Sequence, residues 1–204
     1  MRSWPGSLTS PAALVTAAVL SLVLGLAGCS GGGDDEEPEG ERSTSGAPIE
    51  HRGIDSRVEV GEIAGKLGKR PARKVAADVA QVVDRWLDAA YVGGDYPRSN
   101  FGDAFPGFTK DAAKLAARQG TLMSNKRVGE KIDGVTATRR VIRVDLLAPR
   151  GKPAGATAHV NLVIDLSGDL ERTDQIRGRV VLTRSKSGWR VFGFDIARGE
   201  VRGR

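Results

Sequence analysis

The chain has 204 residues, and 31 Lys and Arg against 25 Asp and Glu give it a net charge of +6. Its single cysteine excludes an internal disulfide, and with only two histidines the composition argues against a zinc site. The sequence contains no nucleophile elbow, no glycine-rich phosphate loop and no histidine pair at zinc-enzyme spacing.

An apolar run of 15 residues, Ala12–Leu26, follows Arg2 near the start of the chain. It is shorter than the ~20 residues that cross a bilayer. A positive start, a short apolar run and small residues at its end are typical of a secretory signal. The run ends in Leu26-Ala27-Gly28-Cys29, which resembles the lipobox of bacterial lipoproteins.

The lipobox resemblance implies that a signal peptidase recognises Leu26, Ala27 and Gly28, and that cleavage follows Gly28. It also implies a diacylglyceryl group on the sulfur of Cys29, and two acyl chains anchor a protein stably to a membrane. The expected location is therefore the extracytoplasmic face of a bacterial cell membrane, lipid-anchored. The alternatives are an ordinary cleaved signal peptide followed by a chance cysteine, and a retained membrane helix.

Three regions are expected: a signal peptide over residues 1–28, a lipidated cysteine with a flexible acidic linker over 29–54, and one folded domain over 55–204. Low hydrophobicity and the acidic run Asp34–Glu41 argue against a packed core in the linker. The acidic run is either a solvated spacer or a site for a basic partner. About 150 residues suffice for one domain with its own core.

Charge is divided unevenly between these regions. Residues 1–28 contribute +1 and residues 29–42 contribute −5, so residues 43–204 carry +10. A basic exported domain attracts anionic lipid head groups, wall polymers or acidic proteins, although scattered Lys and Arg also serve solubility alone. Nucleic acid is the usual partner of such a charge, but the export signal argues against it here.

The first elements of the domain are a bulged edge strand over Arg57–Lys69 and a helix over Pro71–Val92. Pro71 suits the first turn of a helix and Gly93-Gly94 ends it. Apolar residues at helical spacing form one stripe that includes Val75, Val79, Val83 and Trp86, with Tyr91 on or beside it.

A segment punctuated by glycine and proline, Asp95–Phe108, carries four aromatic residues: Tyr96, Phe101, Phe105 and Phe108. These rings are expected either to tuck under the domain or to form the lid of a pocket. Thr109 is placed to cap a second, shorter helix over Lys110–Gln119, with Gly120 after its end.

From Gly134 the apolar residues alternate, which predicts four long strands over 136–148, 156–167, 175–185 and 189–198. Short connections, among them the turn Ser185–Gly188, make successive strands antiparallel. Phe192, Phe194 and Ile196 are predicted to face inward on the last strand. The second face of the sheet mixes polar residues with apolar ones, which suits a wet homodimer face; the apolar ones are Val141, Val163, Val181, Trp189 and Val191.

The predicted fold class is α+β: a long and a shorter helix packed on a curved antiparallel sheet. The order of elements over residues 70–198 and the closing segment Gly188–Phe194 resemble the cone-shaped, nuclear-transport-factor-two-like family. Together with the lipobox and acidic linker, the chain resembles actinobacterial-type envelope lipoproteins. The resemblance implies a pocket between helices and sheet, and the aromatic residues expected to line it are Trp86, Tyr91, Tyr96, Phe101, Phe105, Phe108, Phe192 and Phe194.

Catalytic members of that family use a buried Asp or His near a Tyr or a second acid. The candidates for such a role are Asp84, Asp88, Tyr91, Asp95, Tyr96, Asp103 and His159. Asp84 and Asp88 share what is expected to be the solvated face of the long helix. His159 shares a strand face with Asn161 and Asp165, where it is a general base, a surface residue or part of a dimer contact. None of these is assigned as catalytic.

Three functions remain open from the sequence. The first is a non-catalytic binding or adaptor module for an envelope protein or a small apolar ligand. The second is an accessory lipoprotein that binds anionic wall polymer or lipid through its basic surface. The third is an isomerase, dehydratase or hydrolase of small molecules. No cofactor and no metal is expected; the expected partners are the membrane, through the lipid on Cys29, the ligand or envelope protein, and a second copy of the chain.

Overall fold

The computed structural model describes residues 54–201. The predictions that concern the signal peptide, the lipobox residues Leu26, Ala27 and Gly28, the lipidated Cys29 and the acidic linker up to residue 53 lie outside this range. The described residues belong to one compact unit. Within the described range no helix is both long and apolar enough to cross a membrane.

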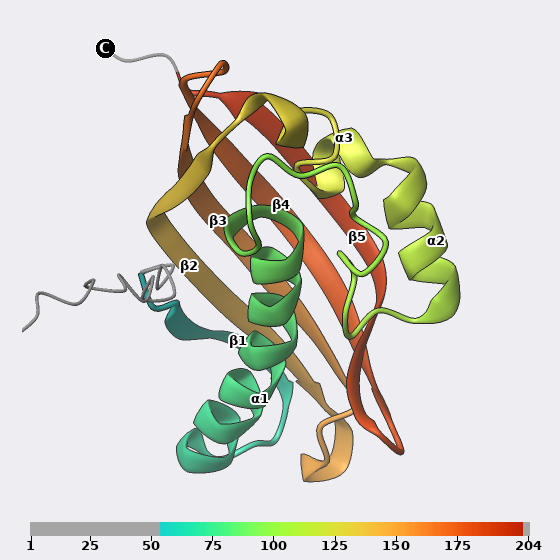
Figure 1. Ribbon diagram of the computed structural model, residues 1–204. Helices are drawn as coiled ribbons and strands as arrows, with labels where there is room; N and C mark the ends of the chain where they lie inside the picture. The colour runs from blue at the N-terminus through green and yellow to red at the C-terminus, as the bar shows by residue number, and fades with distance from the viewer. Residues whose placement is uncertain (1–53, 202–204) are drawn as a thin grey trace, which may run out of the picture. The chain divides into compact units, whose positions relative to one another are not determined.

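Five strands form one mixed sheet in the order β1-β2-β3-β4-β5 (Figure 1). The strands are β1 (Arg57–Gly65), β2 (Gly134–Ala148), β3 (Gly155–Ser167), β4 (Arg172–Ser185) and β5 (Gly188–Glu200). The last four strands form the predicted antiparallel meander.

The prediction of a wholly antiparallel sheet is wrong, because β1 runs parallel to β2. Residues 66–133 separate the two strands, and a connection of that length allows a parallel crossover that a tight turn forbids. The predicted bulge in this edge strand is confirmed by a register shift between Val60 and Ile63.

The long helix is confirmed as α1 (Lys69–Leu87), which continues as the π-helical turn η1 (Asp88–Val92) and ends at Gly93. The second helix is α2 (Lys110–Arg118), where the side chain of Thr109 accepts a hydrogen bond from the amide of Ala112 as its cap. Gly120 begins a further turn, α3 (Gly120–Met123). Two 3-10 turns complete the structure, η2 (Gly129–Lys131) and η3 (Pro149–Gly151).

The core lies between the apolar stripe of α1 and one face of the sheet, which α1 crosses in Figure 1. Val79, Val83 and Trp86 on the helix are fully buried, as are alternate residues of the strands such as Ile142 and Leu162. The apolar residues that recur every 3.6 positions along the helix therefore pack against those that recur every second position along the strands. The opposite side of the sheet is called the outer face below.

The inward direction predicted for Phe192 is wrong, because 52% of this residue is exposed. Val181 pairs with Gly193 and Leu182 pairs with Val191, so Phe192 is an extra residue in β5. Such a bulge exchanges the two faces of a strand. Trp189 and Val191, predicted on the second face, are consequently buried in the core. Val141, Val163 and Val181 are half-buried, and the homodimer face stays a prediction.

Candidate functional site

The aromatic residues expected to line an internal pocket pack mainly against one another. The ring of Trp86 lies 5.7 Å from the rings of both Tyr91 and Phe108, centre to centre, and Phe108 lies 5.6 Å from Phe105 and 6.4 Å from Phe194. Trp86, Tyr91, Phe101 and Phe108 are buried. Tyr96, Phe105 and Phe194 are partly buried against the same core.

The hydroxyl groups of Tyr91 and Tyr96 both donate hydrogen bonds to backbone carbonyl oxygens. Tyr91 donates to the carbonyl oxygen of Leu122 at 2.5 Å, and Tyr96 donates to the carbonyl oxygen of Tyr91 at 2.8 Å. Burial raises the pKa of Tyr91 against the opposing effect of Arg198. Burial likewise raises the pKa of Tyr96, which a hydrogen bond from Asn125 lowers in part. Both phenols therefore remain protonated donors in the physiological range.

Asn125 is a buried residue that the sequence analysis did not single out. Its side-chain amide donates to the carbonyl oxygen of Tyr91 at 2.8 Å and to the hydroxyl of Tyr96 at 2.9 Å, while its backbone amide donates to the carbonyl oxygen of Ala90. Carbonyls at a helix end lack partners within the helix. Asn125 thus stabilises the end of η1, with help from Arg98, whose guanidinium donates to the carbonyl of Ala89 at 3.0 Å.

Asp84 and Asp88 are not simply solvated charges. Arg140 of β2 has a side chain only 6% exposed, and its guanidinium lies 2.8 Å from a carboxylate oxygen of Asp84 and 2.6 Å from one of Asp88. Burial disfavours the charged guanidinium, but the hydrogen bonds and charges of Asp88 and Asp84 raise the pKa of Arg140. The hydroxyl of Ser56 also donates to Asp84. This cluster fixes the end of α1 to the sheet.

Of the remaining acid/base candidates, Asp103 is exposed beside Phe105, and Asp95 lies in the turn after η1. His159 does not pair with Asp165, which accepts a hydrogen bond from Thr173. Its Nε2 lies 2.7 Å from a carboxylate oxygen of Asp145 on the neighbouring strand.

Asp145 is the polar centre of the outer face. Its other carboxylate oxygen accepts a hydrogen bond of 2.9 Å from the amide of Glu62 in β1. Burial acts to raise the pKa of Asp145, but the hydrogen bonds from Glu62 and His159, with the charges of His159 and Arg143, together lower it. The carboxylate is therefore ionised and available as an acceptor.

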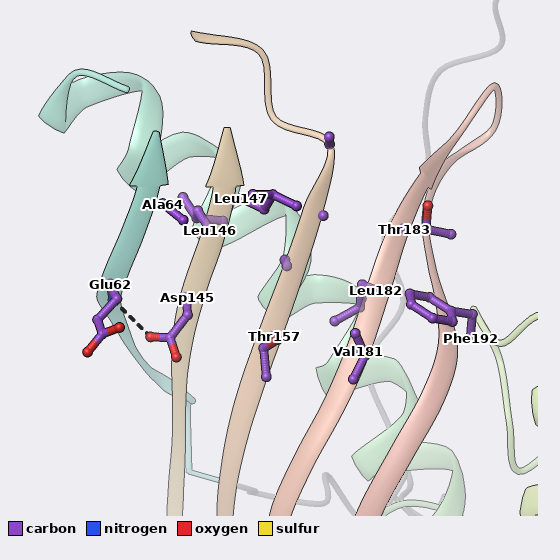
Figure 2. A pocket seen from close by; sticks show the side chains of 13 residues that line it. Glu62, Ala64, Asp145, Leu146, Leu147, Thr157, Val181, Leu182, Thr183 and Phe192 are labelled. Carbon is purple, nitrogen blue, oxygen red and sulfur yellow. Dashed lines mark hydrogen bonds between the residues drawn. The ribbon is translucent and has the colours of Figure 1, made fainter. Parts of the chain in front are cut away.

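A pocket of about 420 Å³ opens on the outer face next to Asp145 (Figure 2). Residues from all five strands line it, and most are apolar. They are Glu62 and Ala64 of β1; Asp145, Leu146 and Leu147 of β2; Ala154, just before β3; Gly155, Ala156 and Thr157 of β3; Val181, Leu182 and Thr183 of β4; and Phe192 of β5. We call it the outer-face pocket.

Two exposed apolar residues border the outer-face pocket. Leu147 is 51% exposed and Phe192 is 52% exposed. Between them lies Gly155, which pairs with Leu147 on one side and with Thr183 on the other. Because Gly155 has no side chain, it leaves a depression in the sheet surface. Of the aromatic residues predicted to line a pocket, Phe192 is the one that lines this pocket.

A sequence pattern could have identified the buried Arg140 and its need for a partner. Arg140 is in phase with Ile142 and Val144, and a charged residue on an apolar strand face requires a buried partner. The exposure of Phe192 and the position of Gly155 depend on cross-strand register, which no local pattern specifies.

Comparison of the chain with protein-family models, with curated proteins and with solved structures finds no match.

Proposed function

We propose that this chain is a lipid-anchored extracytoplasmic lipoprotein whose folded domain binds a small apolar ligand without transforming it. The lipobox Leu26–Cys29 supports the anchor. The cone-like family resemblance remains part of the same proposal. The observation that carries the binding function is the outer-face pocket, an apolar depression on a sheet face that α1 leaves uncovered.

The size of the pocket favours a small molecule over a protein surface. Its volume of about 420 Å³ lies within the ~300–1,000 Å³ typical of ligand sites. Large apolar side chains that are exposed on a protein surface usually lie singly, and a group of them commonly marks a binding site. Here Leu147 and Phe192 border one depression, so a ligand seated there would remove both from water.

The polar groups specify one end of the ligand. Asp145 and Glu62 contribute carboxylates at one side of the pocket, and Asp145 is ionised. A carboxylate accepts hydrogen bonds and donates none. We therefore expect an apolar molecule that carries a hydroxyl or amine group, with the donor directed at Asp145.

The anchor is tested by metabolic labelling of expressing cells with palmitate. Wild-type protein should carry the label in the membrane fraction, whereas Cys29→Ala protein should lose it and leave the membrane fraction. Retention of label in Cys29→Ala would contradict the lipobox interpretation.

Ligand binding is tested on purified residues 46–204, a segment that contains every described element. A neutral fluorescent probe, N-phenyl-1-naphthylamine, should bind saturably to one site. Phe192→Ala should weaken binding while leaving thermal unfolding unchanged within about 0.5 kcal/mol, as usual for an exposed residue. Equal probe binding by Phe192→Ala and wild type would refute the assignment of the pocket.

A further inference from the structure

A second pocket, of about 470 Å³, lies at the opposite end of β4 and β5 from the outer-face pocket. It is formed where α3 and the segment after it approach the end of β5, at the top of Figure 1. It is lined by Thr121, Leu122, Arg127, Val128, Lys131, Leu170, Arg172, Asp174, Arg198, Gly199 and Glu200. We call it the basic pocket.

One buried carboxylate organises the wall of the basic pocket. The side chain of Asp174 is 1% exposed, and its two oxygens lie 2.9 Å from Nε of Arg172 and 2.7 Å from Nη2 of Arg198. Arg198 also donates to the carbonyl oxygen of Ser124 at 2.9 Å, which fixes its orientation. A single negative charge thus holds two guanidinium groups, and the triad retains one positive charge.

Arg172 is the member of the triad that can still bind a ligand. Its side chain is 31% exposed, whereas that of Arg198 is 7% exposed. Nη2 of Arg172 donates a hydrogen bond to Asp174 at 3.1 Å, and Nε lies 2.9 Å from the other carboxylate oxygen without the geometry of a hydrogen bond. Within residues 54–201 no hydrogen bond engages its Nη1. The geometry therefore presents a guanidinium whose position is set before any ligand arrives.

The remaining charges of the pocket are also mainly positive. Arg127 and Lys131 are exposed at its rim, and neither forms an ion pair with another described residue. Four cationic side chains line the pocket against two acidic ones, Asp174 and Glu200. The local net charge of +2 favours an anion.

We propose that the basic pocket binds the phosphate group of a phosphate ester. Arg172 supplies directed donors, and Arg127 and Lys131 add charge from the rim. Nη1 of Arg172 carries two N–H groups, and such charged donors form strong hydrogen bonds to phosphate oxygens. Leu122, Val128 and Leu170 line the same pocket and would contact the carbon portion of the ester. This site is separate from the outer-face pocket, and the inference goes beyond the apolar-ligand function.

The phosphate ester can come from a soluble compound or from a lipid head group, and the experiment distinguishes the two. Full-length protein in an uncharged detergent is titrated by calorimetry with glycerol 1-phosphate. A parallel titration uses micelles of the same detergent that contain phosphatidylglycerol, with diacylglycerol, which lacks the phosphate, as the reference. Binding of both compounds identifies the phosphate ester itself, and binding of phosphatidylglycerol alone identifies the lipid.

The test variant is Arg127→Gln with Lys131→Gln, two exposed residues whose change leaves the Asp174 triad intact. We expect it to bind at least tenfold more weakly than wild type. The matched control is Lys110→Gln with Arg118→Gln, which removes the same charge from α2 and should bind like wild type. An equal loss in the control would mean general charge attraction and overturn the proposal, as would the absence of binding in both titrations.

Discussion

Gly155→Val would fill the outer-face pocket without disturbing the fold. A Cβ atom at position 155 would lie 3.7 Å from the carbonyl oxygen of Leu182 and 3.8 Å from the nearest side-chain atoms of Leu147, which are ordinary contacts. Glycine inside a strand costs roughly 0.5–1 kcal/mol, and valine favours strands on a scale of about 1 kcal/mol. The variant should therefore be as stable as wild type or more stable by about 1 kcal/mol, which is ~3 °C in melting temperature for a domain of this size.

The same valine should weaken ligand binding. The valine side chain would occupy part of the pocket, so the ligand would bury about two methylene groups fewer. Each buried methylene group contributes roughly 0.8 kcal/mol. The result is a fall in affinity of about tenfold.

The assay combines thermal unfolding by circular dichroism with titration of the naphthylamine probe. Gly199→Val is the matched control, because a Cβ at position 199 meets nothing within 4 Å and this residue lies outside the outer-face pocket. The control should bind the probe like wild type. Unchanged affinity in a folded Gly155→Val protein would refute the reasoning, and so would equal losses in both variants.

Three further predictions concern the polar contacts. Arg140→Ala should lower the free energy of unfolding by about 2–3 kcal/mol in urea titrations. This is less than the cost of breaking a fully buried ion pair, because the side chain of Asp84 is 28% exposed. An unchanged urea midpoint would contradict this expectation. Asn125→Ala should cost about 1–2 kcal/mol through its lost hydrogen bonds to Tyr91 and Tyr96, and a smaller loss would mean that the end of η1 needs no such support. The lowered pKa of Asp145 stabilises the fold above the ordinary value of 3.8, and this contribution is lost as the pH falls through the folded pKa. The stability difference between wild type and Asp145→Asn should thus shrink below about pH 4, and a constant difference from pH 6 to pH 3 would refute the linkage.

The sequence predicted α1, α2 and the four-stranded meander because each depends on local information. The apolar spacing that includes Val79, Val83 and Trp86 specifies one helix face, and Thr109 caps α2 as its type and position indicate. Alternation over β2 to β4 likewise specifies the buried face of each strand.

The partner and direction of β1 were not predictable, because its few alternating residues fit either edge and either direction. The face of Phe192 was predicted wrongly for a different reason. One extra residue in β5 shifts the alternation, and the bulge is defined by pairing with Val181 and Leu182 rather than by composition. The outer-face pocket follows from that register, because it requires Phe192, Gly155 and Leu147 on one face.

The most direct test of the apolar-ligand function is a titration of isotope-labelled residues 46–204 with the naphthylamine probe, followed by amide proton and nitrogen NMR spectra. We predict saturable shifts at Leu147, Thr157 and Thr183 around the outer-face pocket, with the amides of Arg127 and Lys131 unchanged. Shifts centred on α1, or shifts that grow without saturation across the whole domain, would contradict a specific site on the outer face.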